Sequence, residues 1–197
     1  MSNQPNTNKE ELLKSIKTAL RGVSLIFYLA IAWLPVFIGS LLIGVVTGGV
    51  GLLGIIVYLV VSVFVIVYGA YLLRRGIEGI GRYYNNQALI EGATVQFILW
   101  LLMLILPVIV SPFVPSSVPS NPGVVISLII LIPLGLKMRD VSKALYDITG
   151  IKTFDTARNR WKWAAYLAII SIGGLIALFA LYSTREGFKR MINQMAQ

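Results

Sequence analysis

The fold is decided by residues 22–73, which read GVSLIFYLAIAWLPVFIGSLLIGVVTGGVGLLGIIVYLVVSVFVIVYGAYLL and contain no Asp, Glu, Lys or Arg. Arg21 precedes this run and Arg74 follows it. A transmembrane helix needs ~20 apolar residues to cross a hydrocarbon core of ~30 Å, so the run has the length of two crossings joined by a turn. The sequence therefore predicts an integral membrane protein.

The composition of the whole chain agrees with this prediction. Of its 197 residues, 57% are hydrophobic and 13% are charged, whereas an average soluble domain is roughly 25% charged. This length predicts one compact bundle without a separate soluble domain. The net charge of +9 is explained in a membrane protein by basic cytoplasmic loops, so no nucleic-acid partner is expected.

The chain contains neither Cys nor His. Their absence removes the usual ligands of zinc, haem, copper and iron–sulfur clusters, and also thiol and imidazole catalysis. All eight carboxylates lie outside the apolar segments, so no Ser triad can be built there. We therefore expect no metal, no cofactor, no catalytic residue and no enzymatic activity.

Hydrophobic patterning predicts an all-α, polytopic transmembrane helix bundle of about five spans. The expected domains are a cytoplasmic tail with an interfacial amphipathic helix (1–21), a transmembrane bundle (22–182) and an amphipathic C-terminal tail (183–197). The second and fourth spans continue into amphipathic cytoplasmic helix extensions, because apolar residues keep one face among charged neighbours. The five predicted spans are residues 22–43, 52–73, 93–110, 124–138 and 163–182.

Local signals predict where helices begin, end and bend. Asn86 can cap the helix after the second span, and Gly150 is typical of the position just past a helix C-terminus. Thr153 or Asp155 can cap the next helix. Pro35, inside the first span, is expected to kink it.

The distribution of basic residues predicts which side of the plasma membrane each loop occupies. Of the 17 Lys and Arg, four precede the first span, three lie between the second and third, seven lie from Lys137 at the end of the fourth span to the start of the fifth, and three follow the fifth. This alternation places the N-terminus in the cytoplasm. Five crossings leave Arg185, Lys189 and Arg190 outside, a conflict that a re-entrant fifth segment folding at Gly173–Gly174 would remove. A full crossing is preferred, since half-helices need protein around them to hide their ends.

The two predicted cytoplasmic turns carry the candidate contact residues. The ordinary interpretation of both is a solvated surface beside the headgroups, and the alternative is a site for anionic lipid, a membrane-protein partner or a second copy of the chain. The candidates are Arg74, Arg75, Arg82, Tyr83 and Tyr84 in the first turn and Arg158, Arg160, Trp161 and Lys162 in the second.

Two short motifs at these turns resemble a known family. YYNN at 83–86 precedes ALI at 88–90, and TGIKTFDTA occupies 149–157. The chain resembles, over roughly residues 52–180, the archaeal membrane family catalogued as domain of unknown function 996, which pairs a Tyr-rich Asn turn with a later Gly-x-Lys-x-Phe-x-Thr-Ala element. It departs from that family at Arg185 and Glu186, where the family tends to stay apolar. The resemblance implies an archaeal source and a multi-pass fold, and no activity or catalytic residue.

Two functional classes follow from these observations. The first is a non-enzymatic structural, scaffold or accessory subunit of the membrane. The second is a channel or transporter for a small neutral solute, using the kink at Pro35 and the short fourth span. Apart from Lys137 at the end of the fourth span, the predicted spans contain no Asp, Glu, Lys or Arg, which argues against proton-driven transport.

Overall fold

In the computed structural model of the protein, the described residues are 4–47, 50–113, 122–170 and 172–196, and they are almost entirely helical, without a strand. The predicted all-α class is confirmed. The helices are α1 (Gln4–Thr47), α2 (Val50–Tyr83), α3 (Gln87–Val110), α4 (Pro122–Thr149), α5 (Lys152–Tyr166) and α6 (Gly173–Met195), with 3-10 turns η1 (Ser111–Phe113) and η2 (Ala168–Ile170).

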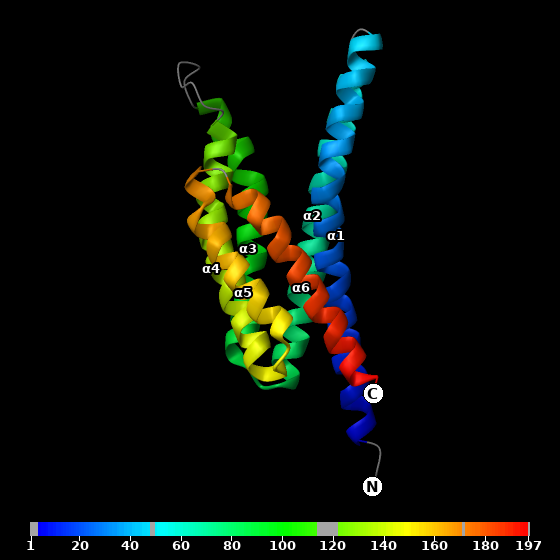
Figure 1. The fold of residues 1–197 in the computed structure, drawn as a ribbon, viewed down its shortest axis with the longest axis vertical. Helices are drawn as coiled ribbons and strands as arrows, with labels where there is room; N and C mark the ends of the chain where they lie inside the picture. Colours follow the sequence, from blue (N-terminus) through cyan, green and yellow to red (C-terminus); the bar gives the residue numbers. More distant parts are fainter. Residues whose placement is uncertain (1–3, 48–49, 114–121, 171, 197) are drawn as a thin grey trace.

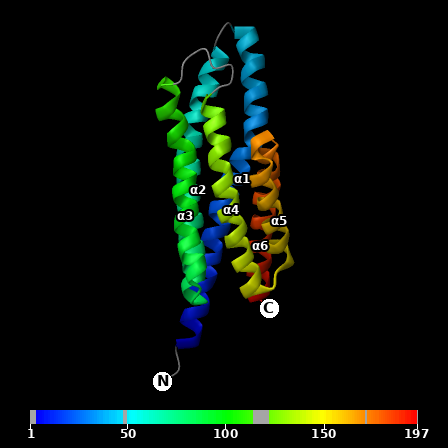
Figure 2. The same cartoon turned by 90° about the vertical axis from the view of Figure 1, so that its left-hand side faces the viewer.

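The six helices form three antiparallel hairpins, α1/α2, α3/α4 and α5/α6, whose tips point the same way (Figure 1). Both chain ends and the two turns between hairpins lie at the opposite end, as Figure 2 also shows. The α5/α6 hairpin is shorter than the other two, and α6 descends beside α1. The N- and C-termini are therefore at the same end of the bundle.

Helices α1 and α2 approach until their backbones touch. A methyl group at Gly22 of α1 would lie 2.5 Å from the carbonyl oxygen of Gly69, and one at Gly76 of α2 would lie 2.6 Å from Cβ of Ala19. Small residues at a helix contact permit this close packing, which is common where lipid surrounds the helices. The pairing of α1 with α2 therefore depends on glycine at these positions.

Three helices are long and apolar enough to cross a membrane, which is fewer than the five predicted spans. The candidate segments among the described residues are Asn8–Ser40, Ile56–Tyr83 and Gln87–Val110. The predicted fourth span lies in α4, where Lys137, Arg139 and Asp140 end a short apolar stretch. The predicted helical continuations of the second and fourth spans are confirmed, since α2 and α4 extend to Tyr83 and Thr149.

The predicted fifth span is not one helix. Helix α5 ends at Tyr166 and α6 begins at Gly173, with η2 between them. The two helices run antiparallel, because the Phe154 and Phe188 rings meet edge to face with centroids 5.3 Å apart and Trp161 donates a hydrogen bond to Thr184. The prediction of a single crossing helix over 163–182 is wrong, because the chain reverses direction at η2 and α6 packs back against α5 and α1.

The two amphipathic ends of the chain are not separate tails. Residues 9–20 belong to α1, and Leu12 and Ile16 are buried in the bundle rather than lying on a membrane surface. Residues 183–195 belong to α6, with Phe188 and Met191 buried. The predicted boundaries at 21 and 183 therefore fall inside continuous helices, whose apolar faces pack into the same core as the rest of the bundle.

Burial is uneven along the bundle. Near the chain ends, Ile16, Leu73 and Phe188 are wholly buried. Toward the hairpin tips, large apolar side chains face outward, with Phe64 71% and Val108 73% exposed. The half that contains the termini has a conventional hydrophobic core, whereas the tip half carries its apolar residues on the surface.

At the turns between hairpins, two of the predicted helix-end residues act as predicted and the predicted cap of α5 does not. Asn86 caps α3, since its Oδ1 accepts a 3.1 Å hydrogen bond from the backbone N–H three residues later. Gly150 follows α4 with φ of +67°, as predicted for a C-terminal glycine. Helix α5 begins after Ile151 without a side-chain cap, so neither Thr153 nor Asp155 serves as one.

Candidate functional site

The end of the bundle that contains the termini also contains its charges. The three uncharged runs of the sequence are residues 22–73, 92–136 and 163–184. Each run forms the tip portion of one hairpin, so the charged residues before and after it lie toward the opposite end. We call that end the basic end, because 17 Lys and Arg outnumber 8 Asp and Glu.

An open groove of about 1080 Å³ runs between α1 and α2 at the basic end. Three basic side chains, Lys14, Arg75 and Arg82, line it with two acidic ones, Glu11 and Glu78. Arg82 is paired with Glu78 at 2.6 Å, and its side chain remains 72% exposed. The groove is polar, and its charged side chains carry a net charge of +1.

The two predicted tyrosines stand beside this groove. Tyr83 lines it, and the rings of Tyr83 and Tyr84 meet edge to face with centroids 5.0 Å apart. Burial, and then the neighbouring Tyr83, raises the pKa of Tyr84 above its usual value of 10.0. The Tyr84 phenol therefore stays protonated at neutral pH and can donate a hydrogen bond.

The candidates on α5 divide into exposed and buried residues. Arg158 forms an ion pair of 2.7 Å with Asp155, and Lys162 is exposed with its Nζ 5.8 Å from the Tyr166 ring centroid. Trp161 is wholly buried and cannot contact lipid or a partner from that position. The prediction of a surface role for Trp161 is wrong, because its face of α5 packs against α6.

Arg160 joins the two helices of the last hairpin. Its Nη1 donates to the carbonyl oxygen of Phe179 at 3.1 Å and to Oγ of Ser183 at 2.5 Å. One turn of α6 thus accepts both hydrogen bonds from a single guanidinium atom. Arg160 holds the hairpin together more than it presents charge to the surroundings.

The two arginines at the start of the first predicted set have different surroundings. Arg75 is exposed and donates to the Tyr71 hydroxyl at 3.4 Å. Arg74 is half-buried, with its guanidinium carbon 5.4 Å from the centroid of the Phe97 ring on α3. Arg75, Arg82 and Tyr83 therefore line the groove. Arg74 points toward α3 instead, and the candidates on α5 do not line the groove.

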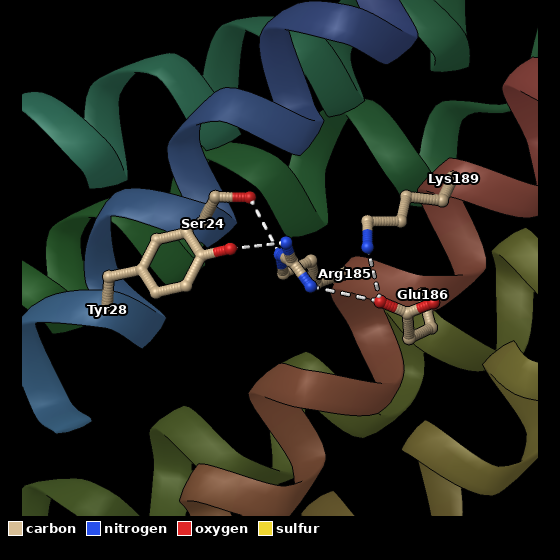
Figure 3. A network of polar contacts seen from close by, with 5 residues as sticks. All are labelled: Ser24, Tyr28, Arg185, Glu186 and Lys189. Carbon is tan, nitrogen blue, oxygen red and sulfur yellow. Dashed lines mark hydrogen bonds and ion pairs between the residues drawn. The ribbon is translucent and has the colours of Figure 1, made fainter.

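A polar network that sequence reasoning missed connects α6 to α1 (Figure 3). Arg185 donates from Nε to Ser24 Oγ at 3.1 Å and from Nη2 to the Tyr28 hydroxyl at 2.5 Å. Its Nη1 pairs with Glu186 at 3.0 Å, and Glu186 also pairs with Lys189 at 2.8 Å. The Arg185 side chain is only 14% exposed, so this network is a fixed junction between the last hairpin and the first helix.

The signal for this junction was present in the charge distribution. Ser24 and Tyr28 lie one turn apart on α1, just inside the uncharged run. Arg185 is the first charged residue after the third uncharged run, at the position that conflicted with five crossings. The α5/α6 hairpin brings these residues to the same level of the bundle.

Comparisons with protein-family models, with curated proteins and with solved structures find no match for this chain. Within the described residues, no group of three acidic side chains is arranged to hold a metal ion. What the arrangement offers chemically is a polar groove, exposed basic and aromatic side chains, and an apolar tip half.

Proposed function

We propose that the protein is a non-enzymatic integral membrane protein of the plasma membrane that acts as a structural, scaffold or accessory subunit. The carrying observation is the outward-facing apolar tip half, opposite a basic end with its own core. Exposing one large apolar side chain to water costs about 1.5–3 kcal/mol. Side chains such as Phe64, Val108 and Ile169, which are 71%, 73% and 77% exposed, are stable in lipid without a protein cover.

The proposed topology has four crossings, by α1 to α4, and a re-entrant α5/α6 hairpin. Both termini then lie in the cytoplasm with every Lys and Arg, as the positive-inside rule favours. Helix α4 has a short apolar stretch, and a crossing by it requires local thinning of the bilayer or help from the residues before it. The even number of crossings removes the conflict over Arg185, Lys189 and Arg190.

At the cytoplasmic face, the basic end is the proposed contact for anionic headgroups. Arg75 and Arg82 in the groove and Lys162 on α5 are the exposed basic candidates, and Arg158 on α5 is half-buried. Each basic residue near an anionic surface contributes about 1 kcal/mol of attraction. The uncovered α1/α2 tip is the corresponding surface for a membrane-protein partner or a second copy. The resemblance to the archaeal family belongs to this proposal and adds no activity to it.

Cysteine accessibility tests the topology directly, because the chain has no Cys of its own. Single substitutions Phe113→Cys, Asn86→Cys and Asn193→Cys are treated with an impermeant thiol reagent in intact cells. We expect labelling of Phe113→Cys alone, with the other two labelled after permeabilisation. Labelling of Asn193→Cys in intact cells, with Asn86→Cys protected, would restore a fifth crossing. Labelling of Asn86→Cys in intact cells would invert the topology.

Reconstitution tests the role. As an accessory subunit, the protein is expected to copurify with a defined partner after mild detergent extraction and to leave proteoliposomes no leakier than empty vesicles. The transport alternative relies on the kink expected at Pro35, a residue inside the continuous helix α1, and on the short fourth span. Flux of a small neutral solute above that of empty vesicles would replace the scaffold proposal with transport.

A further inference from the structure

Two neighbouring helices contain buried polar atoms without partners. Gln96 of α3 is wholly buried, and among the described residues neither its Nε2 nor its Oε1 has a hydrogen-bond partner. Nε1 of Trp100, one turn further along α3, is also buried and unpartnered. So is Nε of Arg74 on α2. Natural proteins satisfy nearly all such atoms, so this concentration needs an explanation.

These groups lie at neighbouring levels of the bundle. Gln96 and Trp100 are four residues apart and therefore share a face of α3. The Arg74 guanidinium lies over the ring of Phe97, which follows Gln96 in the chain. Arg74 is also the residue at which the uncharged run of α2 ends. The polar groups thus begin at the basic end and extend about two turns into the uncharged run of α3.

The unpartnered groups include more hydrogen-bond donors than acceptors. They comprise one N–H on Arg74, two on Gln96 and one on Trp100, whereas the Gln96 carbonyl oxygen is the single acceptor. Arg74 adds a positive charge. Burying these groups unpaired is unfavourable, and the imbalance calls for a guest that accepts hydrogen bonds.

We propose that Arg74, Gln96 and Trp100 form an internal site, between α2 and α3, for a small hydrogen-bond acceptor that enters from the basic end. Two sources have this chemistry, a water molecule and a halide-sized anion. Either one satisfies the N–H groups that the protein leaves without partners, as buried waters do in other proteins. The site goes beyond the proposed scaffold role and does not depend on it.

The substitution Gln96→Leu tests the site by whether it lowers the melting temperature. With a guest present, leucine removes the guest's partners and leaves the N–H groups of Trp100 and Arg74 unpaired. The melting temperature in detergent should then fall by on the order of 5 °C. In a dry site, leucine replaces two unsatisfied atoms by apolar ones, and the melting temperature should not fall.

Salt composition separates the two sources. The wild-type protein and the Gln96→Leu variant are melted in sodium bromide and in sodium gluconate at equal ionic strength. A fall caused by Gln96→Leu, with bromide stabilising only the wild-type protein, identifies an anion. The same fall without a bromide effect identifies water. If Gln96→Leu does not lower the melting temperature in either salt, the proposal is overturned. Should that variant fail to fold, Trp100→Phe deletes one N–H, keeps an aromatic ring and carries the same test.

Discussion

Replacing Gly76 by alanine should separate α1 from α2. The new methyl group would meet the backbone nitrogen of Ala19 and lie 2.6 Å from its Cα and its Cβ. Backbone atoms cannot rotate away, so the cost lies near the upper end of the ~1–3 kcal/mol typical of overpacking. Alanine recovers about 1 kcal/mol through its higher helix propensity. The net loss should be about 2 kcal/mol, measured as SDS-induced unfolding in mild detergent followed by circular dichroism.

Two other glycines make this a graded test. At Gly39 of α1 a methyl group meets nothing within 4 Å, so Gly39→Ala should stabilise the protein by up to about 1 kcal/mol. At Gly79 a methyl group would meet Oγ of Ser15, which can rotate away, and would lie 2.8 Å from Cβ of Ser15, which cannot, so Gly79→Ala should fall between the two. If Gly76→Ala unfolds at the same SDS fraction as Gly39→Ala, the helices are not in backbone contact and the reasoning is refuted.

Two junctions of the last hairpin give further predictions, read by the same unfolding assay. Arg185→Met should lower the free energy of unfolding by about 2–3 kcal/mol and Tyr28→Phe by about 1 kcal/mol, because each removes charge-assisted hydrogen bonds between helices. If the losses add up in the double variant, the two side chains do not interact. Arg160→Lys should cost about 1 kcal/mol, since it replaces the guanidinium that reaches α6. Arg158→Lys keeps a surface ion pair and should change stability by less than about 0.5 kcal/mol. Equal effects of these two lysine substitutions would contradict the junction assigned to Arg160.

Much of the helical framework could be predicted from the sequence because its signals are local. The charge-free run at 22–73 predicted a helical pair, which the structure shows as α1 and α2. Asn86 and Gly150 marked two turns through backbone chemistry that any chain would use. The amphipathic stripes past Leu73 and Leu136 correctly indicated that α2 and α4 continue as helices.

The contact residues were harder to predict because their roles depend on distant partners. Trp161 and Arg160 sit in a basic, aromatic stretch that is typical of a headgroup contact. Their partners on α6 lie 19 to 23 positions away. Arg185 meets α1 across 161 positions at Ser24. No local pattern encodes such pairings, and only the conflict in charge topology pointed to the fold that makes them.

The uneven core has a physical explanation if the tip half lies in lipid, as proposed. The hydrophobic effect drives helices together only where water is the alternative environment. At the basic end that condition holds, and side chains from all six helices, such as Ile16, Leu73 and Phe188, are buried in one core. In lipid the driving force is absent, and helices stay together only through close packing or polar contacts. The α1/α2 tip accordingly diverges from the α3/α4 tip (Figure 1), while the small residues between α1 and α2 keep that pair together. The basic end is therefore the part whose packing fixes how the three hairpins are arranged, and the tips are the part left available to lipid or to a membrane partner.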